Sequence, residues 1–440
     1  MTSRRKFIRG AGAAAAGFQI IPSRLLAQGP STQVNVAAIG AGGRAEADIA
    51  GVVGAGANIV SLCDVDVNRS MKKREQFPQA KFYTDWREML EKEADNIDAV
   101  TVATPDHTHA VAAMAAIKLG KHVYVEKPLT RTISEARALK EAAAEAGVCT
   151  QMGNQGHAAN GARLTNEWIQ SGSIGEVTEV HTRTNRPIWP QGMMRPEPSE
   201  PPESLNWDLW LGPVPFKPYG KDIAPFKWRG FLDYGTGALG DMGAHILDHP
   251  VWALGLDVPT SIEAVRVNRN VPGSEKDTHP NSCELVYHFP AKGDRPAVKL
   301  VWYDGKFEIP TNERMKGGAK PPGNGCVYYG KDHVMQHGSH GGNPSIMSKN
   351  AGDHVKPEQT MERSPGHHKE WVEAIKANDP SMAKSNFDYA APLTELMLLG
   401  VIASVIGEGT KLTWDPETMK TGNADADKLV HHVYRDGWSL

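Results

Sequence analysis

The sequence predicts an α/β domain built on a parallel sheet, followed by an α+β domain with a large, mostly antiparallel sheet. Residues 34–152 alternate apolar, β-rich runs with helical stretches, whereas residues 153–440 contain strand-like runs with long connections. A chain of 440 residues that is 40% hydrophobic can form two cores of this kind. Residues 1–30 precede both domains and have the composition of a leader.

The leader is typical of a twin-arginine export signal. Arg4 and Arg5 stand in a short basic region, the Ala/Gly-rich segment Gly10–Ile21 follows, and Ala27 is the expected cleavage position. This segment is too short to span a bilayer. We therefore expect export by the twin-arginine route to the periplasm or another extracytoplasmic space, with no further membrane contact. The alternative is a basic tail ahead of a linker.

The charge balance argues against polyanionic partners. The full chain has a formal charge of −3, and the leader carries five basic residues and no acidic one, so the rest of the chain is five charges more negative. Such a surface repels nucleic acid and anionic membranes. A neutral, polar small molecule such as a carbohydrate is the substrate class that it favours.

In the first domain, short connections join the expected strands and helices. Strands are expected at Val34–Ile39, Asn58–Cys63, Ala99–Ala103, His122–Val125 and Val148–Gln151, and helices at Ala45–Val53, His107–Leu119 and Ile133–Ala146. Strand–helix–strand units of this kind form parallel sheets that are covered on both faces.

The second domain is predicted from a different pattern. A helix (Ala162–Gln170), a strand (Val177–Arg183), a Pro/Trp-rich insert (Arg186–Lys227) and a helix (Gly240–Leu254) precede strands at Ser261–Val267, Cys283–Phe289 and Val298–Tyr303. Residues 304–360 show little periodicity, and we expect them to be surface excursions of the sheet. The last helices, His367–Ala377 and Ala391–Ile406, are expected to pack back against the first domain.

A glycine-rich turn closes the first strand and opens the first helix. Gly40, Gly42 and Ala45 match the dinucleotide fingerprint of the Rossmann fold, in which the glycines permit a tight turn and a close approach to a pyrophosphate. The next strand ends at Asp64, the position expected to hold a ribose diol. The carboxylate would repel a 2′-phosphate, and we therefore expect NAD rather than NADP.

Residues with acid–base chemistry follow the later strands. Glu126 and Lys127 end one strand, where ligands bind in open α/β sheets, and a lysine there can donate to a substrate oxygen. Asp241 and His245 are four residues apart on an expected helix, and Asp248 continues the same face. An Asp can fix the tautomer of a His or share its work as a base; an ordinary helix ion pair is the alternative.

No metal site is predicted. The four cysteines (Cys63, Cys149, Cys283 and Cys326) are widely spaced and form no CxxC pair, which supports neither a zinc site nor a redox pair. The histidine groups His337/His340, His367/His368 and His431/His432 have no helical partner or carboxylate cluster, so we expect solvated or hydrogen-bonded imidazoles.

Four motifs occur in a fixed order between about residues 34 and 300. They are Gly40-Ala41-Gly42-Gly43, Ala103-Thr104-Pro105, Glu126-Lys127-Pro128, and Trp228-Arg229 followed by Gly240-Asp241-Met242-Gly243-Ala244-His245. Together they resemble the glucose–fructose oxidoreductase/inositol dehydrogenase (Gfo/Idh/MocA) family. The resemblance implies that Lys127, Asp241 and His245 line the substrate beside the nicotinamide, with His245 as the proton acceptor. It also implies a homo-oligomer, a dimer or tetramer joined through the antiparallel sheet, and a cis bond before Pro128.

The expected cofactor-binding set combines the fingerprint with this resemblance. It consists of Gly40, Gly42, Gly43, Arg44, Asp64, Thr104, Pro105, His109, Glu126, Lys127, Asn154, Trp228 and Arg229.

The expected reaction is hydride transfer between NAD and a secondary hydroxyl of a sugar, polyol or glycoside, with His245 as base, Asp241 orienting it and Lys127 holding the oxygen. The resemblance to exported members of the family implies a tightly held cofactor. Two alternatives are a redox-neutral cycle, such as glycoside cleavage or sugar exchange, and a binding protein that keeps the fold without catalysis. The insert Arg186–Lys227 and the tail Tyr434–Trp438 are not features of the simple sugar dehydrogenases and leave the net reaction open.

Overall fold

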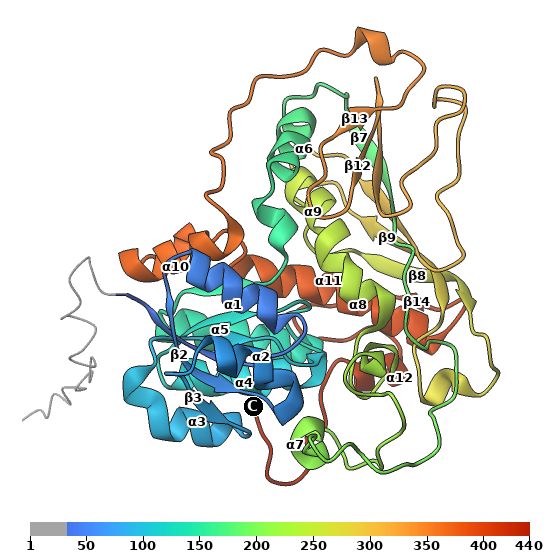
Figure 1. Cartoon of the computed structure of the whole chain (residues 1–440). Coiled ribbons are helices and arrows are strands. Elements are labelled where there is room, and N and C mark those ends of the chain that lie inside the picture. Colours follow the sequence, from blue (N-terminus) through green and yellow to red (C-terminus); the bar gives the residue numbers. More distant parts are fainter. Residues whose placement is uncertain (1–32) are drawn as a thin grey trace, which may run out of the picture. The chain divides into compact units, whose positions relative to one another are not determined.

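The computed structural model describes residues 33–440 (Figure 1). The leader, with Arg4, Arg5 and the expected cleavage position Ala27, lies outside the described residues.

The first domain contains a six-stranded parallel sheet in the order β3-β2-β1-β4-β5-β6, which is the order of a Rossmann fold. Its strands are β1 (Asn35–Ile39), β2 (Asn58–Cys63), β3 (Lys81–Tyr83), β4 (Ala99–Val102), β5 (His122–Val125) and β6 (Thr150–Met152). Its helices are α1 (Ala45–Gly54), α2 (Val67–Gln76), α3 (Trp86–Glu93), α4 (Asp106–Lys118) and α5 (Ile133–Ala146). The parallel-sheet prediction is confirmed, and β3, α2 and α3 are additions to it.

The second domain is built on an eight-stranded sheet in the order β13-β12-β11-β7-β10-β9-β8-β14. Its strands are β7 (Val177–Arg183), β8 (Ser261–Asn268), β9 (Ser282–Phe289), β10 (Val298–Tyr303), β11 (Gly325–Gly330), β12 (Val334–Gly338), β13 (Ser345–Ile346) and β14 (Lys411–Leu412). The pair β7–β10 is parallel and the other pairs are antiparallel, which confirms a mostly antiparallel sheet.

The expectation that residues 304–360 are only surface excursions is wrong. Strand β11 lies between β7 and β12, and all six of its residues are buried. A strand buried on both faces has a continuous apolar run in place of an alternating one, and Cys326-Val327-Tyr328-Tyr329 is such a run. This run of four residues is too short to be recognised as a strand in a Gly-rich segment.

The helices of the second domain are α6 (Asn160–Gln170), α7 (Trp207–Leu211), α8 (Gly237–Ile246), α9 (Asp248–Leu254), α10 (His367–Ala377), α11 (Phe387–Ile406) and α12 (Ala424–Leu429). The single helix expected at Gly240–Leu254 is two helices that divide at Leu247. Pro250 has no N–H to donate to the carbonyl of Ile246, which instead accepts the Cys326 thiol at 3.3 Å.

Helices α10 and α11 pack against elements of the first domain (Figure 1). Trp371 of α10 joins the core formed by Ile49 and Val52 of α1, and its indole donates to the carbonyl of Cys149. Within residues 33–440, α11 alone is long and apolar enough to cross a membrane, but 78% of its apolar window is buried inside the protein. It is therefore a core helix here.

Candidate active site

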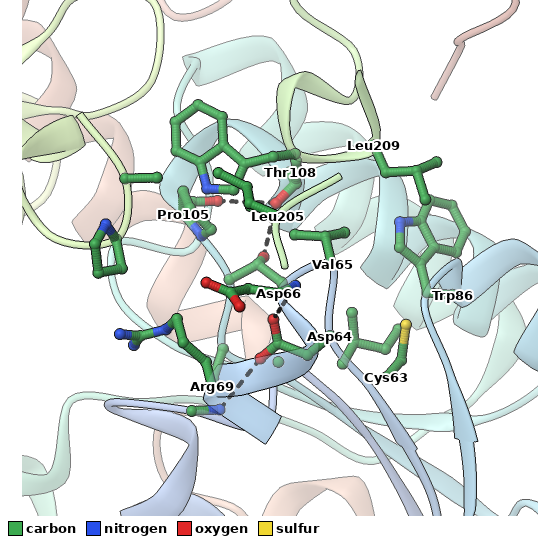
Figure 2. A pocket seen from close by; sticks show the side chains of 18 of the residues that line it. Cys63, Asp64, Val65, Asp66, Arg69, Trp86, Pro105, Thr108, Leu205 and Leu209 are labelled. Carbon is green, nitrogen blue, oxygen red and sulfur yellow. Dashed lines mark hydrogen bonds between the residues drawn. The ribbon is translucent and has the colours of Figure 1, made fainter. Parts of the chain in front are cut away.

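A cavity opens at the carboxyl ends of β1, β2 and β4. Figure 2 shows its lining, which the first domain and the insert Arg186–Lys227 share. Of the expected cofactor-binding residues, the cavity is lined by Gly40, Gly42, Arg44, Asp64, Thr104, Pro105 and Trp228.

The glycine turn fits a dinucleotide. Gly40 has a φ of +92°, and a Cβ atom at this position would lie 2.6 Å from the carbonyl oxygen of Ala103. A Cβ on Gly42 would lie 3.0 Å from Arg69, and Gly43 has a φ of +64°. The turn therefore tolerates only glycine at Gly40, and it leads into α1, whose N-terminus suits a pyrophosphate.

The carboxylate of Asp64 lies at one end of the cavity. Its Oδ2 accepts hydrogen bonds from the amides of Ala41 (2.9 Å) and Gly42 (3.2 Å), and its Oδ1 accepts one from Asp66 (3.0 Å). Burial raises the pKa of Asp64, and the amides of Ala41 and Asp66 oppose this rise. The acid thus braces the glycine turn in addition to facing the cavity.

Arg69 is a cavity residue that the sequence analysis did not identify. It lies on α2, five residues beyond Asp64, and lines the cavity beside that acid (Figure 2). Its side chain also approaches Gly42 and Gly43. The first turn of α2 brings Arg69 close to Asp64. The sequence analysis did not identify Arg69 because it did not predict helix α2.

The insert forms part of the cavity lining. Leu205, Leu209, Trp210 and Pro225 of the insert line it, together with Trp228, which follows the insert. Backbone hydrogen bonds fasten the insert to the loop after β2, from Val67 to Ser204 (3.0 Å) and from Asn206 to Val65 (2.9 Å).

The C-terminal tail supports this arrangement. Trp438 contacts Trp86, a cavity residue, with ring centroids 6.1 Å apart, and Arg435 pairs with Asp208 of the insert at 2.8 Å. Trp210 of the insert and Trp228 after it are therefore on the side of the expected cofactor.

Lys127, Asp241 and Arg229 form an ion cluster between the two domains. Nζ of Lys127 lies 2.7 Å and Nε of Arg229 lies 3.3 Å from Oδ1 of Asp241, and Arg229 also pairs with Asp106 at 2.9 Å. Burial alone would raise the pKa of Asp241, but the charges of Lys127 and Arg229 outweigh burial and lower it. Asp241, on α8, is therefore a charged carboxylate that holds the ammonium of Lys127, which follows β5.

His245 lies one turn further along α8 and is 3% exposed. Its Nδ1 is buried and has no hydrogen-bond partner within residues 33–440. Burial and the nearby charge of Lys127 lower its pKa well below the ordinary value, so the ring is neutral and can accept a proton. The ring of His340, from the segment after β12, stacks on it with a centroid distance of 3.9 Å.

Two expectations about this helix face need correction. Asp241 was expected to orient the ring of His245. In the structure its carboxylate instead pairs with Lys127 and Arg229, so it orients the lysine. Asp248 does not continue the site: it is fully buried and bonds His157 (3.0 Å) and Tyr389 (2.5 Å). The chain bends between α8 and α9 because Pro250 breaks the hydrogen-bond ladder.

Six expected cofactor residues are not part of the cavity lining: Gly43, His109, Glu126, Lys127, Asn154 and Arg229. Glu126 accepts from Arg44 at 2.9 Å, and the Asn154 side chain accepts from Ser385. The two ring nitrogens of His109 lie 2.8 and 2.9 Å from the carbonyl oxygens of Pro128 and Thr104. These side chains position the strand ends around the cavity. The Lys127–Pro128 bond is cis, as the resemblance implies.

Comparison with known proteins follows the same division of the chain. Residues 34–154 match the family profile described as "oxidoreductase family, NAD-binding Rossmann fold" (Gfo/Idh/MocA), and residues 168–289 match its "C-terminal alpha/beta domain". The two matches together cover more than half of the chain. The chain belongs to the Gfo/Idh/MocA oxidoreductase family.

Among curated relatives, levoglucosan dehydrogenase of Pseudarthrobacter phenanthrenivorans is 28% identical over 39% of this chain and 36% of its own length. The scyllo-inositol 2-dehydrogenase (NADP(+)) of Bacillus subtilis is 26% identical over 57% of each chain. The matches thus span well under two thirds of these relatives.

Solved structures share the fold over a larger part of the chain. An NAD-binding protein from Listeria innocua superposes with a TM-score of 0.60 and 16% identity, over 87% of this chain and 97% of its own. An inositol dehydrogenase homologue from Azotobacter vinelandii, in complex with NADH and myo-inositol, gives 0.57 and 16%, over 87% and 98%.

Within residues 33–440 no three His, Cys, Asp or Glu side chains lie together as a metal site.

Proposed function

We propose that this protein transfers hydride between a bound nicotinamide dinucleotide, NAD rather than NADP, and a secondary hydroxyl of a sugar, polyol or glycoside. The observation that carries the proposal is a fixed ammonium beside an imidazole nitrogen without a bond. Lys127 is held by Asp241 at 2.7 Å, and Nδ1 of His245, one turn away, has no partner in the described part of the chain. The names of the relatives, levoglucosan and scyllo-inositol dehydrogenases, support a carbohydrate-like substrate.

The side chains divide the work as follows. Lys127 donates a hydrogen bond to the substrate oxygen and stabilises the charge that develops there. His245, neutral because of its burial, accepts the hydroxyl proton at a ring nitrogen. Asp241 and Arg229 hold the ammonium in place. The dinucleotide, when bound, supplies the hydride acceptor or donor.

A redox-neutral net reaction is the second candidate, because residues of the insert, together with Trp228, line the cofactor cavity and the tail packs against Trp86 and Asp208. Leu209, Trp210 and Trp228 are among these lining residues, and Trp438 contacts Trp86. A cofactor held in this way must be restored within the site. Oxidation of a ring hydroxyl acidifies the adjacent C–H, elimination then releases an aglycone, and reduction of the sugar product after water addition returns the cofactor to its first state. A hydride exchange between two sugars satisfies the same condition.

Mass spectrometry of the nucleotide released when the purified full-length protein is denatured tests the cofactor. NAD, in stoichiometric amount, is the expected result, and NADP would reverse the cofactor assignment. The protein is then incubated with glycosides in the absence of an added acceptor. Release of aglycone supports the cleavage cycle, reduction of a second sugar supports exchange, and turnover only with added NAD supports a simple dehydrogenase. A preparation without nucleotide and without saturable NAD binding would leave a non-catalytic binding protein.

We also propose export by the twin-arginine route and assembly into a dimer or tetramer. Export of a folded protein suits a cofactor that is loaded before crossing. Assembly through the second sheet would need an uncovered face of that sheet. Part of one face is already covered, because Ile309 and Met315, beyond β10, pack on Val301 and Tyr329. Fractionation of cells and light scattering of the purified protein test the two points.

A further inference from the structure

The segment that connects β12 to β13 places an imidazole over the proposed base. The backbone amide of His340 donates to the carbonyl of His245 at 3.0 Å, and the next amide, Gly341, donates to Nε2 of His249 at 2.9 Å. The segment 338–342 is thus fastened directly to the helices that carry the site.

Two glycines, Gly156 and Gly161, allow the segment 338–342 to lie close to α6 and the turn before it. A Cβ atom on Gly156 would lie 2.5 Å from Cα of His340, and one on Gly161 would lie 2.1 Å from the carbonyl oxygen of Gly341. Any larger residue at either position would push the segment away from α8.

His340 itself has a φ of +59°, in the left-handed region that most residues other than glycine avoid. Glycine would adopt this conformation without steric cost, so the backbone alone does not explain a histidine here. The imidazole is the part of the residue that requires an explanation.

The stacked rings exclude one role for His340. The two planes are inclined by 21° with centroids 3.9 Å apart, so the nitrogens of the rings do not point at each other and no proton passes directly between them. Nδ1 of His340 meets the hydroxyl of Ser339 at 3.0 Å, which leaves Nε2 of this exposed ring for a ligand. The charged groups that act on the ring are Lys127 and Asp241 of the proposed site, Arg44 of the cofactor cavity, and Arg186, whose Nε lies 4.0 Å from Oδ2 of Asp241.

We propose that His340 binds the substrate, with its Nε2 hydrogen-bonded to a hydroxyl adjacent to the one that His245 deprotonates, so that the site selects vicinal diols on a ring. This inference rests on the proposed function and specifies its substrate class. In this proposal each of the two stacked imidazoles bonds one of two neighbouring ring hydroxyls, and the 3.9 Å between the ring centroids brings the two contacts close together.

Binding to single-deoxy analogues tests the proposal. The full-length protein is loaded with NADH, and quenching of the NADH fluorescence gives the Kd of methyl β-D-glucoside and of its 2-, 3-, 4- and 6-deoxy analogues. The wild type is expected to bind at least one deoxy analogue about 10-fold more weakly than the parent because a hydrogen bond is lost. His340→Gly, which removes the ring and relieves the backbone, is expected to bind that analogue and the parent within about 2-fold of each other.

Two further variants make the outcome unambiguous. His340→Asn keeps a residue that tolerates the left-handed region and serves if the glycine variant is not folded. His288→Ala removes an imidazole of β9, and its discrimination is expected to equal that of the wild type. Unchanged discrimination in both His340 variants, with binding otherwise intact, would overturn the role of His340 and leave the proposed function standing. Absence of binding of every glucoside by the wild type would overturn the proposed substrate class and this inference together.

Discussion

Nζ of Lys127 lies 2.7 Å from Oδ1 of Asp241, and this ion pair joins the end of β5 in the first domain to α8 in the second. The two side chains are 12% and 10% exposed, so water competes little for either charge. An ammonium has three donors, and one of them is used here. The remaining donors are available to a substrate oxygen, at a place that the carboxylate determines.

Replacement of Asp241 by Asn should reduce kcat/KM by about 10²–10⁴-fold while the Kd of NAD stays unchanged. The amide cannot balance the ammonium, so Lys127 is no longer fixed. Lys127→Met should reduce kcat/KM to a similar extent. The control is Lys299→Met, which breaks an exposed pair with Glu179 and is expected to change the free energy of unfolding by less than about 1 kcal/mol. Full activity of Lys127→Met would contradict the role of the ammonium.

The pH dependence of oxidation should report the neutral state of His245. Its pKa is lowered by burial and by the charge of Lys127, and a base works in its deprotonated form, above its pKa. The acid limb of the kcat/KM profile is therefore expected below pH 6.5, with activity lost as the pH falls through the lowered pKa. The profile is measured for alcohol oxidation with saturating NAD. An acid limb above pH 6.5 that survives in His245→Gln would assign the titration to another group.

Gly40→Ala should abolish NAD binding and lower the thermal midpoint. A Cβ atom there meets the Ala103 carbonyl at 2.6 Å, and the positive φ adds strain of about 1–3 kcal/mol. Gly54→Ala is the matched control because nothing lies within 4 Å of its Cβ and it ends α1, where alanine is expected to be neutral or to stabilise by up to about 1 kcal/mol. Fluorescence titration with NAD and thermal unfolding compare the two variants. Equal effects of both substitutions would refute the steric argument.

The parts of the fold and site that could be predicted are those with a local signature. The turn at Gly40, the acid at Asp64 and the strand end at Lys127 each combine a residue type with a place in a strand–helix unit, and the parallel sheet follows from the same alternation. The second sheet was predicted in its kind, but β11 was missed because a short strand buried on both faces has no alternating pattern.

The contacts that could not be predicted arise from tertiary packing. His340 was expected to be a solvated or hydrogen-bonded imidazole, and it is exposed and bonded to Ser339. Its stacking on His245, which the glycines of α6 and its preceding turn allow, has no signal in the sequence. Asp241 was expected to orient His245 because the two residues are four apart on one helix. In the structure the carboxylate of Asp241 accepts a hydrogen bond from the ammonium of Lys127. Spacing gives neighbours on one helix and does not reveal a competing partner from another element.

Asp64 is expected to determine the preference for NAD over NADP. Its carboxylate lies at the cavity end and should repel a 2′-phosphate, while the guanidinium of Arg69, which also lines the cavity, should attract one. Asp64→Ser is therefore expected to raise the affinity for NADP relative to NAD by about 10-fold or more, the equivalent of about 1.4 kcal/mol. Nucleotide titrations give the ratio, and thermal unfolding checks that the turn braced by Asp64 through Ala41 and Gly42 survives.

The double variant Asp64→Ser/Arg69→Ala separates the two charges. If Arg69 supplies the attraction, this variant should lose most of the gained NADP affinity while its NAD affinity changes little. Retention of the full gain would show that the serine alone relieved the repulsion and that Arg69 does not reach the phosphate. Because Arg69 approaches Gly42 and Gly43 with its side chain, its removal also leaves the glycine turn less covered, and a faster dissociation of both nucleotides in the double variant is expected from the same contact.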